Sequence, residues 1–157
     1  MASTTRATQA LTAAKVAFTV HHYEYDPNAE RIGMQAAEAL GEPASRVLKT
    51  LMALVDGKPV CVVVPSDKDV SMKKLAAAFG GKKAEMMPPA DAERVTGYHV
   101  GGISPFGQKR RAPTALEEAA LGEPYVFMNG GQRGLQVRLA PADAAQALGA
   151  KTASLIA

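Results

Sequence analysis

The sequence is short of cysteine and of long apolar runs, and each shortage excludes a class of protein. Cys61 is the one cysteine among 157 residues, so no internal disulfide can form, and a reducing cytoplasm suits the chain better than a secreted context. No apolar stretch approaches the roughly 20 residues that a membrane-spanning helix needs. We therefore expect a cytoplasmic protein that does not act in a membrane.

Aromatic residues and familiar catalytic motifs are also scarce. Aromatic residues make up 5% of the chain, which leaves no array on which nucleic-acid bases would stack. There is no P-loop, dinucleotide fingerprint, HExxH or CxxC metal pattern, or GxSxG elbow. His21 and His22 point to opposite faces of an expected strand and His99 is far away, so we predict no metal site and no cofactor. The VCVVV context of Cys61 is typical of a small buried hydrophobic residue rather than of a nucleophile.

What the chain does contain is the composition of an ordinary globular protein, with 47% hydrophobic and 21% charged residues. A chain of this length buries roughly 68 to 70% of its unfolded surface in one core, so residues 1–157 are expected to form one domain. The opening residues 2–17 lack acids and carry Arg6 and Lys15, yet we interpret them as the first helix, capped by Ser3 or Thr4, rather than as a transit peptide.

Hydrophobic periodicity and turn residues predict the remaining elements. The first predicted helix uses Ala7, Ala10, Leu11 and Ala14 as its apolar face, and the others cover residues 34–40, 71–79, 88–96 and 141–148. The predicted strands cover residues 18–25, 48–55, 60–64, 125–129 and 135–139. Because 48–55 and 60–64 are apolar on both faces, they need cover on each side. We predict a mixed α+β domain with a curled β-sheet or small barrel surrounded by helices.

Lys49 is the first candidate for chemistry. Strand alternation places it on the same face as Leu51, Ala53 and Val55, among apolar groups. It is either a lysine whose ammonium reaches solvent at the strand end, or a cation at the mouth of a pocket that attracts a phosphate or an oxyanion. Thr50 adds a hydroxyl on the opposite face.

A glycine-rich segment is the second candidate. Residues 97–108 have no helical period, and Gly101 and Gly102 leave backbone N–H groups open to a ligand. Ser104 can donate a hydrogen bond there, but no neighbouring base is identified that would make it a nucleophile. An ordinary surface loop explains the same composition.

The net charge of +3 is too small to indicate nucleic-acid binding by itself. The basic residues nevertheless fall into compact clusters, which are either solvated surface or contacts for phosphate. These clusters are Lys73–Lys74, Lys82–Lys83 and Lys109–Arg110–Arg111.

Four segments together resemble the YbaK/EbsC family, in the same order and over nearly the whole chain. They are YEYDP (23–27), Lys49–Thr50, TGYHVGGISPFGQK (96–109) and GQRGL (131–135). The resemblance implies a barrel-like domain related to the editing insertion of prolyl-tRNA synthetases. It also implies a trans-editing deacylase that releases cysteine from mischarged Cys-tRNA(Pro), with the substrate's own thiol as the attacking group, and docking with prolyl-tRNA synthetase.

The resemblance further implies roles for individual residues. Lys49, Gly101 and Gly102 are expected to be catalytic. The substrate-binding residues are expected to be Tyr23, Ile32, Thr50, Ile103, Ser104, Asn129 and Gln136. Ile32 replaces an aromatic residue of the relatives, and Asn129 and Gln136 replace a serine and an acid, which alters the shape and polarity of the pocket. Lys109, Arg110 and Arg111 are the candidates for contact with tRNA phosphates.

Two other functions remain open at this point. One is editing of a different amino acid, alanine or serine, because the three substituted positions reshape the pocket. The other is a noncatalytic nucleotide- or RNA-binding module, which the basic clusters and the glycine loop favour. A role confined to docking other proteins explains less of the sequence, and no DNA specificity is expected.

Overall fold

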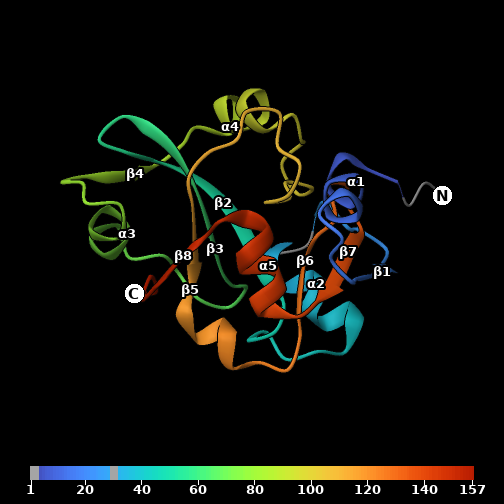
Figure 1. Cartoon of the computed structure of the whole chain (residues 1–157). Coiled ribbons are helices and arrows are strands. Elements are labelled where there is room, and N and C mark those ends of the chain that lie inside the picture. The colour runs from blue at the N-terminus through green and yellow to red at the C-terminus, as the bar shows by residue number, and fades with distance from the viewer. Residues whose placement is uncertain (1–3, 29–31) are drawn as a thin grey trace.

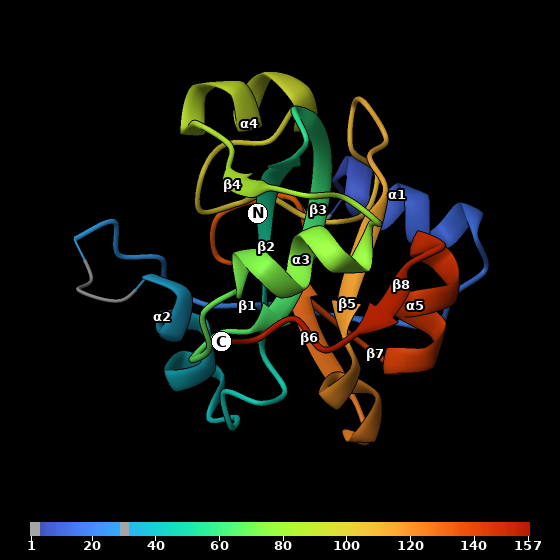
Figure 2. The same ribbon diagram turned by 90° about the vertical axis from the view of Figure 1, so that its left-hand side faces the viewer.

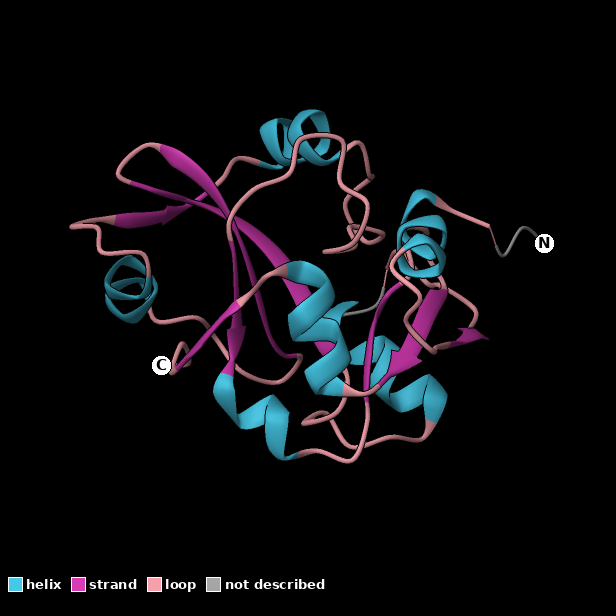
Figure 3. Cartoon of the chain, in the orientation of Figure 1, coloured by secondary structure: helices cyan, strands magenta, loops and turns pink. Residues whose placement is uncertain are grey.

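The computed structural model describes residues 4–28 and 32–157, and the side chains of residues 32 and 33 lie outside that description. Its helices are α1 (Arg6–Ala13), α2 (Ile32–Leu40), α3 (Met72–Ala78), α4 (Pro89–Thr96), the 3₁₀ helix η1 (Glu118–Gly122) and α5 (Pro141–Leu148). Its strands are β1 (Thr19–His22), β2 (Leu48–Val55), β3 (Lys58–Pro65), β4 (Ala84–Met86), β5 (Thr114–Glu117), β6 (Val126–Asn129), β7 (Leu135–Leu139) and β8 (Lys151–Ala153). The mixed α+β class is therefore confirmed (Figure 3).

The strands form two sheets rather than one closed barrel in the described residues. A five-stranded sheet has the order β4-β2-β3-β5-β8 and a three-stranded sheet the order β1-β7-β6. A parallel bridge between Val47 and Phe127 joins the two sheets at the start of β2, where the Phe127 N–H donates to the Arg46 carbonyl at 2.7 Å. The prediction of a curled, barrel-like arrangement therefore corresponds to two sheets that meet at one corner (Figure 1).

The β2–β3 hairpin is the centre of the larger sheet. Its two strands pair antiparallel in full register from Leu48–Pro65 to Val55–Lys58, so only Asp56 and Gly57 form the turn. The predicted turn of four residues was too long, because Lys58 and Pro59 belong to β3. The tight turn suits Asp56 and Gly57, which both have positive φ angles of 50° and 81°.

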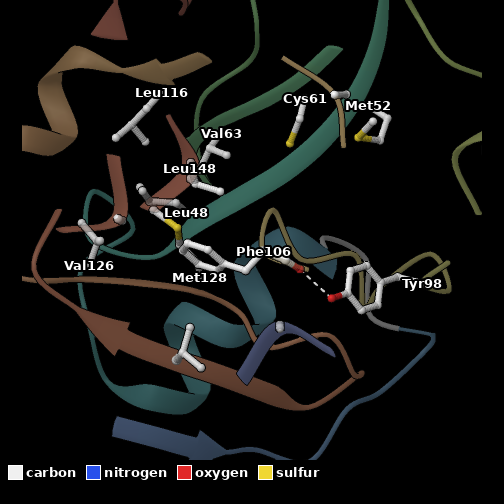
Figure 4. Packing of buried hydrophobic residues seen from close by; sticks show 14 of the residues in the cluster. Leu48, Met52, Cys61, Val63, Tyr98, Phe106, Leu116, Val126, Met128 and Leu148 are labelled. Atoms are coloured by element: carbon white, nitrogen blue, oxygen red, sulfur yellow. Dashed lines mark hydrogen bonds between the residues drawn. The ribbon is translucent and has the colours of Figure 1, made fainter. Parts of the chain in front are cut away.

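Both apolar faces of the β2–β3 hairpin are covered by other elements, as the sequence requires. On one face of the larger sheet α3 packs with Leu75 against Val62 and Val64 (Figure 2). On the other face Leu48, Met52, Cys61 and Val63 meet side chains of the smaller sheet, of α1 and of α5 (Figure 4). Alternate residues of β2 thus enter different cores, as the period of a strand requires.

Several boundaries differ from the predicted ones. The N-cap of α1 is Thr5, whose Oγ1 accepts the Thr8 N–H at 3.1 Å, rather than Thr4, and Ser3 lies outside the described residues. Strands β4, β5 and β8 were not predicted, because two of them span three residues and β5 has the sequence TALE, which carries no strand signal. In the described part of the chain no helix is long and apolar enough to cross a membrane.

Candidate active site

A small cleft opens beside β2, at the part of its edge that no strand covers. β4 pairs with residues 53–55 of β2, and the bridge to β6 lies at Val47. Between these contacts, residues 49–51 have no ladder partner on the side away from β3 among the described residues. The cleft that begins here has a volume of about 240 Å³ and is also lined by α2, α4, the glycine loop and strands β6 and β7. Ligand clefts usually measure ~300–1,000 Å³, so this one suits a small group.

The structure brings most of the predicted site residues together in this cleft. Lys49 and Thr50 line it together with Gly101, which lies about fifty positions further along the sequence. The predicted substrate-binding residues that line it with them are Tyr23, Ile103, Asn129 and Gln136. The side chain of Ile32 lies outside the described residues, although its backbone begins α2.

Lys49 occupies the cleft wall without a strong partner. Its side chain is 24% exposed, and its Nζ lies 4.0 Å from Oδ1 of the exposed Asp69, which is the limit for an ion pair. Exposed pairs of this kind contribute about 0 to 1 kcal/mol, so Asp69 does not neutralise the ammonium. The two alternatives for Lys49 are thus compatible, because it reaches solvent while lining the cleft.

Two buried polar atoms in the cleft have no hydrogen-bond partner within the described residues. They are Oγ1 of Thr50 and Oε1 of Gln136. Gln136 is 4% exposed, so its amide oxygen is removed from water without an internal donor. An unpaired buried polar group costs about 1 to 3 kcal/mol. A ligand that supplies a donor to Gln136 and a partner to the Thr50 hydroxyl would remove this cost.

Tyr23 lines the cleft beside Gln136. Burial raises the pKa of its hydroxyl, while a hydrogen bond with the Gln136 side chain acts in the opposite direction. The hydroxyl therefore stays protonated at neutral pH and acts as a neutral polar wall.

The mouth of the cleft is apolar. Met86 of β4 is 47% exposed and Val100 of the glycine loop is 43% exposed, and both line the cleft. The sequence did not indicate either residue, because β4 is too short to be recognised and exposure cannot be seen in a pattern. Apolar side chains exposed at the rim of a cleft are typical of a ligand contact.

Asn129 holds the glycine loop in place. Its Nδ2 donates to the Gly101 carbonyl at 3.2 Å, and its Oδ1 accepts the Gly131 N–H at 2.7 Å. Arg133 adds a second clamp, since its Nε donates to the Val100 carbonyl at 2.9 Å and its guanidinium lies 5.5 Å from the centre of the Tyr25 ring. Tyr25 and Arg133 were not singled out from the sequence, although both lie in the segments that carry the family resemblance.

Gly102 and Ser104 do not occupy the places predicted for them. The Gly102 N–H donates to the His99 carbonyl at 2.8 Å, so it is already used within the loop and Gly102 does not line the cleft. Ser104 is fully buried, and its Oγ accepts the Phe106 N–H at 3.2 Å. The sequence locates the loop, but it cannot show which of its polar groups are already hydrogen-bonded within the loop itself.

Gly102 instead lets two loops approach closely. A Cβ atom at this position would lie 2.8 Å from the Arg133 backbone nitrogen, which is closer than real Cβ contacts, and 3.0 Å from the Gln132 carbonyl carbon, which is tighter than most of them. We expect Gly102→Ala to lower the free energy of unfolding by about 1 to 3 kcal/mol, the usual cost of overpacking. Gly122→Ala is the control, because nothing lies within 4 Å of its Cβ position. Chemical denaturation of both variants measures the difference, and equal stability would contradict the packing role of Gly102.

The predicted phosphate contacts lie elsewhere. Lys109, Arg110 and Arg111 are exposed and do not line the cleft that contains Lys49. They follow the glycine loop, where the N–H groups of Lys109 and Arg110 bond to carbonyls of Thr96 and Val95 at the end of α4. In the described residues no group of three or more His, Cys, Asp and Glu side chains is arranged to hold a metal ion.

Known proteins are similar to this chain in sequence. The model of the aminoacyl-tRNA editing domain matches residues 26–147. The chain is 39% identical over 121 residues to a putative Cys-tRNA(Pro)/Cys-tRNA(Cys) deacylase, EbsC, of Enterococcus faecalis, which covers 76% of this chain and 74% of that protein. It is also 43% identical over 70 residues to a proline–tRNA ligase of Geobacter metallireducens, covering 45% of this chain and 12% of the ligase.

Solved structures agree on the fold. A putative trans-editing enzyme for prolyl tRNA synthetase superposes with a TM-score of 0.83 at 24% identity, covering 100% of this chain and 98% of the other. A hypothetical protein superposes with a TM-score of 0.86 at 22% identity, covering 98% of this chain and 100% of the other. The predicted resemblance to the YbaK/EbsC family is confirmed by the extent of the match to EbsC. The chain belongs to the aminoacyl-tRNA editing domain family.

Proposed function

We propose that the protein is a trans-editing deacylase that removes cysteine from mischarged Cys-tRNA(Pro). One observation carries the proposal: Lys49, the unpaired Thr50 hydroxyl and the unpaired Gln136 amide oxygen share one small cleft. The name of the relative from Enterococcus faecalis supports cysteine as the amino acid. A separate editing step is needed because a synthetase pocket distinguishes groups that differ by one methylene by only about 1 to 3 kcal/mol.

The substrate supplies the nucleophile in this proposal. The cysteine thiol gives up its proton and its sulfur attacks the ester carbonyl carbon, forming a four-membered thiolactone. The bond between that carbon and the ribose oxygen breaks, and the ribose oxygen takes up a proton as the free tRNA leaves. Water then opens the thiolactone to cysteine. An aminoacyl ester is already activated, so positioning and charge stabilisation are sufficient contributions from the protein.

Each cleft residue has a defined part in this step. Lys49 and the Thr50 hydroxyl face the negative charge that develops on the carbonyl oxygen, with the Gly101 N–H as a further donor. Gln136 Oε1 accepts a hydrogen bond from the α-ammonium group, which offers three donors and no acceptor. Tyr23 and Ile103 enclose the side chain of the amino acid, and Asn129 positions Gly101. Met86 and Val100 pack against the terminal adenosine at the mouth.

Cys61 takes no part in this mechanism. It is fully buried in the core, and burial raises the pKa of its thiol to about 12. Roughly one thiol in 10⁵ is then ionised at neutral pH, which is too few for a nucleophile. We expect Cys61→Ala to deacylate Cys-tRNA(Pro) within about twofold of the wild-type rate, while losing about 1 kcal/mol of stability through the small cavity. Single-turnover rates of the folded variant measure this effect. Loss of activity in a Cys61→Ala protein that still folds would mean that Cys61 is a nucleophile after all.

A panel of mischarged tRNAs tests the proposed function. Cysteine, alanine and serine esters of tRNA(Pro) are compared in single-turnover deacylation, with and without prolyl-tRNA synthetase. The proposal expects the cysteine ester to be cleaved fastest, because alanine has no side-chain nucleophile and serine a much weaker one. Faster cleavage of alanine or serine would assign a different editing specificity. Tight binding of tRNA without cleavage of any ester would favour a binding module.

The synthetase arm of the panel addresses partners. We propose that prolyl-tRNA synthetase delivers tRNA(Pro) to this protein, since a chain of 157 residues has little surface with which to read a whole tRNA. A rate for Cys-tRNA(Pro) that rises on addition of the synthetase, with no such rise for Cys-tRNA(Cys), is the expected result.

A further inference from the structure

A second and larger cleft is not used by the proposed reaction. It has a volume of about 660 Å³ and lies at the tip of the β2–β3 hairpin, between that tip, the end of α3 and residues 110–113. We call it the hairpin-tip cleft. Its apolar walls include Val55, Pro59, Val60, Phe79, Val95 and Pro113.

Positive charge surrounds this cleft. The cations that line it are Lys58, Arg110 and Arg111. In the sequence, Lys82 and Lys83 directly follow Gly81, which also lines the cleft, and Lys109 directly precedes Arg110. Three cations thus line the cleft, and the backbone of Lys82 and Lys83 lies beside Asp56 at its edge, although the net charge of the protein is only +3. Phosphate groups are attracted to such a cluster.

Asp56 is the single acid among the described residues that line the cleft, so it offsets one of the three positive charges of Lys58, Arg110 and Arg111. The Asp56 carboxylate accepts the backbone N–H groups of Lys82 and Lys83 at 2.9 to 3.1 Å. It is therefore engaged in holding the turn before β4. Nη2 of Arg111 points to the Leu148 carbonyl at 3.4 Å, toward the end of α5. Lys58 and Arg110 are exposed and have no carboxylate within 4.0 Å among the described residues, although the Lys58 ammonium attracts the nearby Asp56 carboxylate.

The two clefts share two elements, β2 and α4, each of which contributes lining residues to both. β2 contributes Thr50 to the first cleft and Val55 to the second, and α4 contributes Ala92 to the first and Val95 to the second. At about 3.3 Å per residue, Thr50 and Val55 are roughly 17 Å apart along the strand. A few nucleotides of extended RNA span that distance.

We propose that the hairpin-tip cleft binds the phosphate backbone of the tRNA acceptor arm, a few nucleotides on the 5′ side of the aminoacylated adenosine. The inference rests on the proposed function, because that function places the 3′ end of the RNA in the first cleft. Arg110 supplies a planar fork that matches a phosphate, and Lys58, which lines the same cleft, supplies a compact charge. RNA explains the cleft better than an acidic protein segment does, because β2 and α4 both run from the first cleft, which receives the 3′ end of the RNA in the proposed function, to this one.

Binding of uncharged tRNA(Pro) tests this directly, without any cleavage. Fluorescence anisotropy of a labelled transcript is measured at several KCl concentrations for the wild type and for Lys58→Ala/Arg110→Ala. We expect the double variant to bind at least about tenfold more weakly, since each lost charged hydrogen bond is worth about that factor. The slope of log K against log salt becomes shallower by about 1.4 to 1.8, at 0.7 to 0.9 per phosphate contact.

Lys15→Ala/Lys68→Ala is the matched control. It removes the same charge from exposed positions that line neither cleft. Its affinity for tRNA is expected to stay within about twofold of the wild-type value, and its salt slope within about 0.3. The reason is that the control changes only the overall electrostatic field of the protein. Equal losses in both double variants would overturn the proposal, since the effect would then be one of net charge. An unchanged salt slope in Lys58→Ala/Arg110→Ala would overturn it as well.

Kinetics separate this cleft from the first one. For Cys-tRNA(Pro) the KM of Lys58→Ala/Arg110→Ala should rise about tenfold, whereas for cysteinyl-adenosine, which has no upstream phosphate, it should change by less than about twofold. An equal rise for both substrates would mean that the variant disturbs the first cleft, and would overturn the proposal. Loss of synthetase binding at unchanged affinity for tRNA would assign the cleft to a protein. If the wild type cleaves neither substrate, the proposed deacylation fails, and the anisotropy comparison still decides whether the hairpin-tip cleft binds RNA.

Discussion

Lys49→Ala is expected to slow deacylation of Cys-tRNA(Pro) by about 10²- to 10³-fold in single-turnover experiments. Removal of one group that stabilises a developing oxyanion costs this much in other acyl-transfer sites. Lys49 is well placed for the role, because its side chain lies mostly buried in the cleft wall and its only ion pair in the described residues is a 4.0 Å contact with exposed Asp69.

Two further variants sharpen this test. Lys49→Arg keeps the charge but changes its shape, so partial activity is expected if charge matters more than fit. Lys68→Ala removes an exposed lysine that does not line the cleft and is expected to act like the wild type. Folding is checked by thermal unfolding, which should change little, because the Asp69 contact contributes almost nothing. Wild-type rates in Lys49→Ala would remove the lysine from the mechanism.

Thr50→Val should lower activity and raise stability in the same protein. The Thr50 hydroxyl is buried and unpaired in the structure, so its replacement by an isosteric methyl group removes a buried polar cost of about 1 to 3 kcal/mol. Valine also suits a strand. If the hydroxyl donates to the oxyanion, the same change lowers kcat by about 10²-fold.

The two readouts together distinguish function from structure. Denaturation and single-turnover deacylation are measured on Thr50→Val and on Thr50→Ser, which keeps the hydroxyl and should recover most of the activity. Thr114→Val provides a contrast, because the Thr114 hydroxyl donates to the Ala112 carbonyl at 3.2 Å and its removal is expected to destabilise the protein. A Thr50→Val variant that is both less stable and fully active would refute the assigned role.

The central hairpin and the closing helix could be predicted because each has a strong local pattern. β2 and β3 are apolar runs around a turn, and α5 begins with Pro141 and ends before Gly149. β5 could not be found in the same way, since it is defined by parallel partners on both sides, one of them β8 near the C-terminus. Such pairing depends on residues far away in the sequence, and local propensity does not record it.

The candidate site was predictable only in part, for a related reason. Residue type and resemblance pointed to Lys49, Thr50 and Gly101, and the structure places all three in one cleft. The state of each hydrogen-bonding group could not be predicted, so Gly102 was assigned a free N–H that the turn to His99 consumes. Met86 and Val100 were missed because their position at the mouth depends on how β4 and the glycine loop meet.

The short open edge of β2 has a consequence for solubility as well. Exposed strand edges invite neighbouring molecules to add a strand, and long ones lead to aggregation. Here the opening is limited to residues 49–51, with β4 hydrogen-bonded on one side through Met87 and Met52 at 3.1 Å and the bridge to β6 on the other. Three residues are too few to pair with a new strand, and the first of them is Lys49, whose charge also discourages such pairing. At this opening the protein can thus keep main-chain groups accessible to a small substrate without presenting an edge long enough for another strand to pair with.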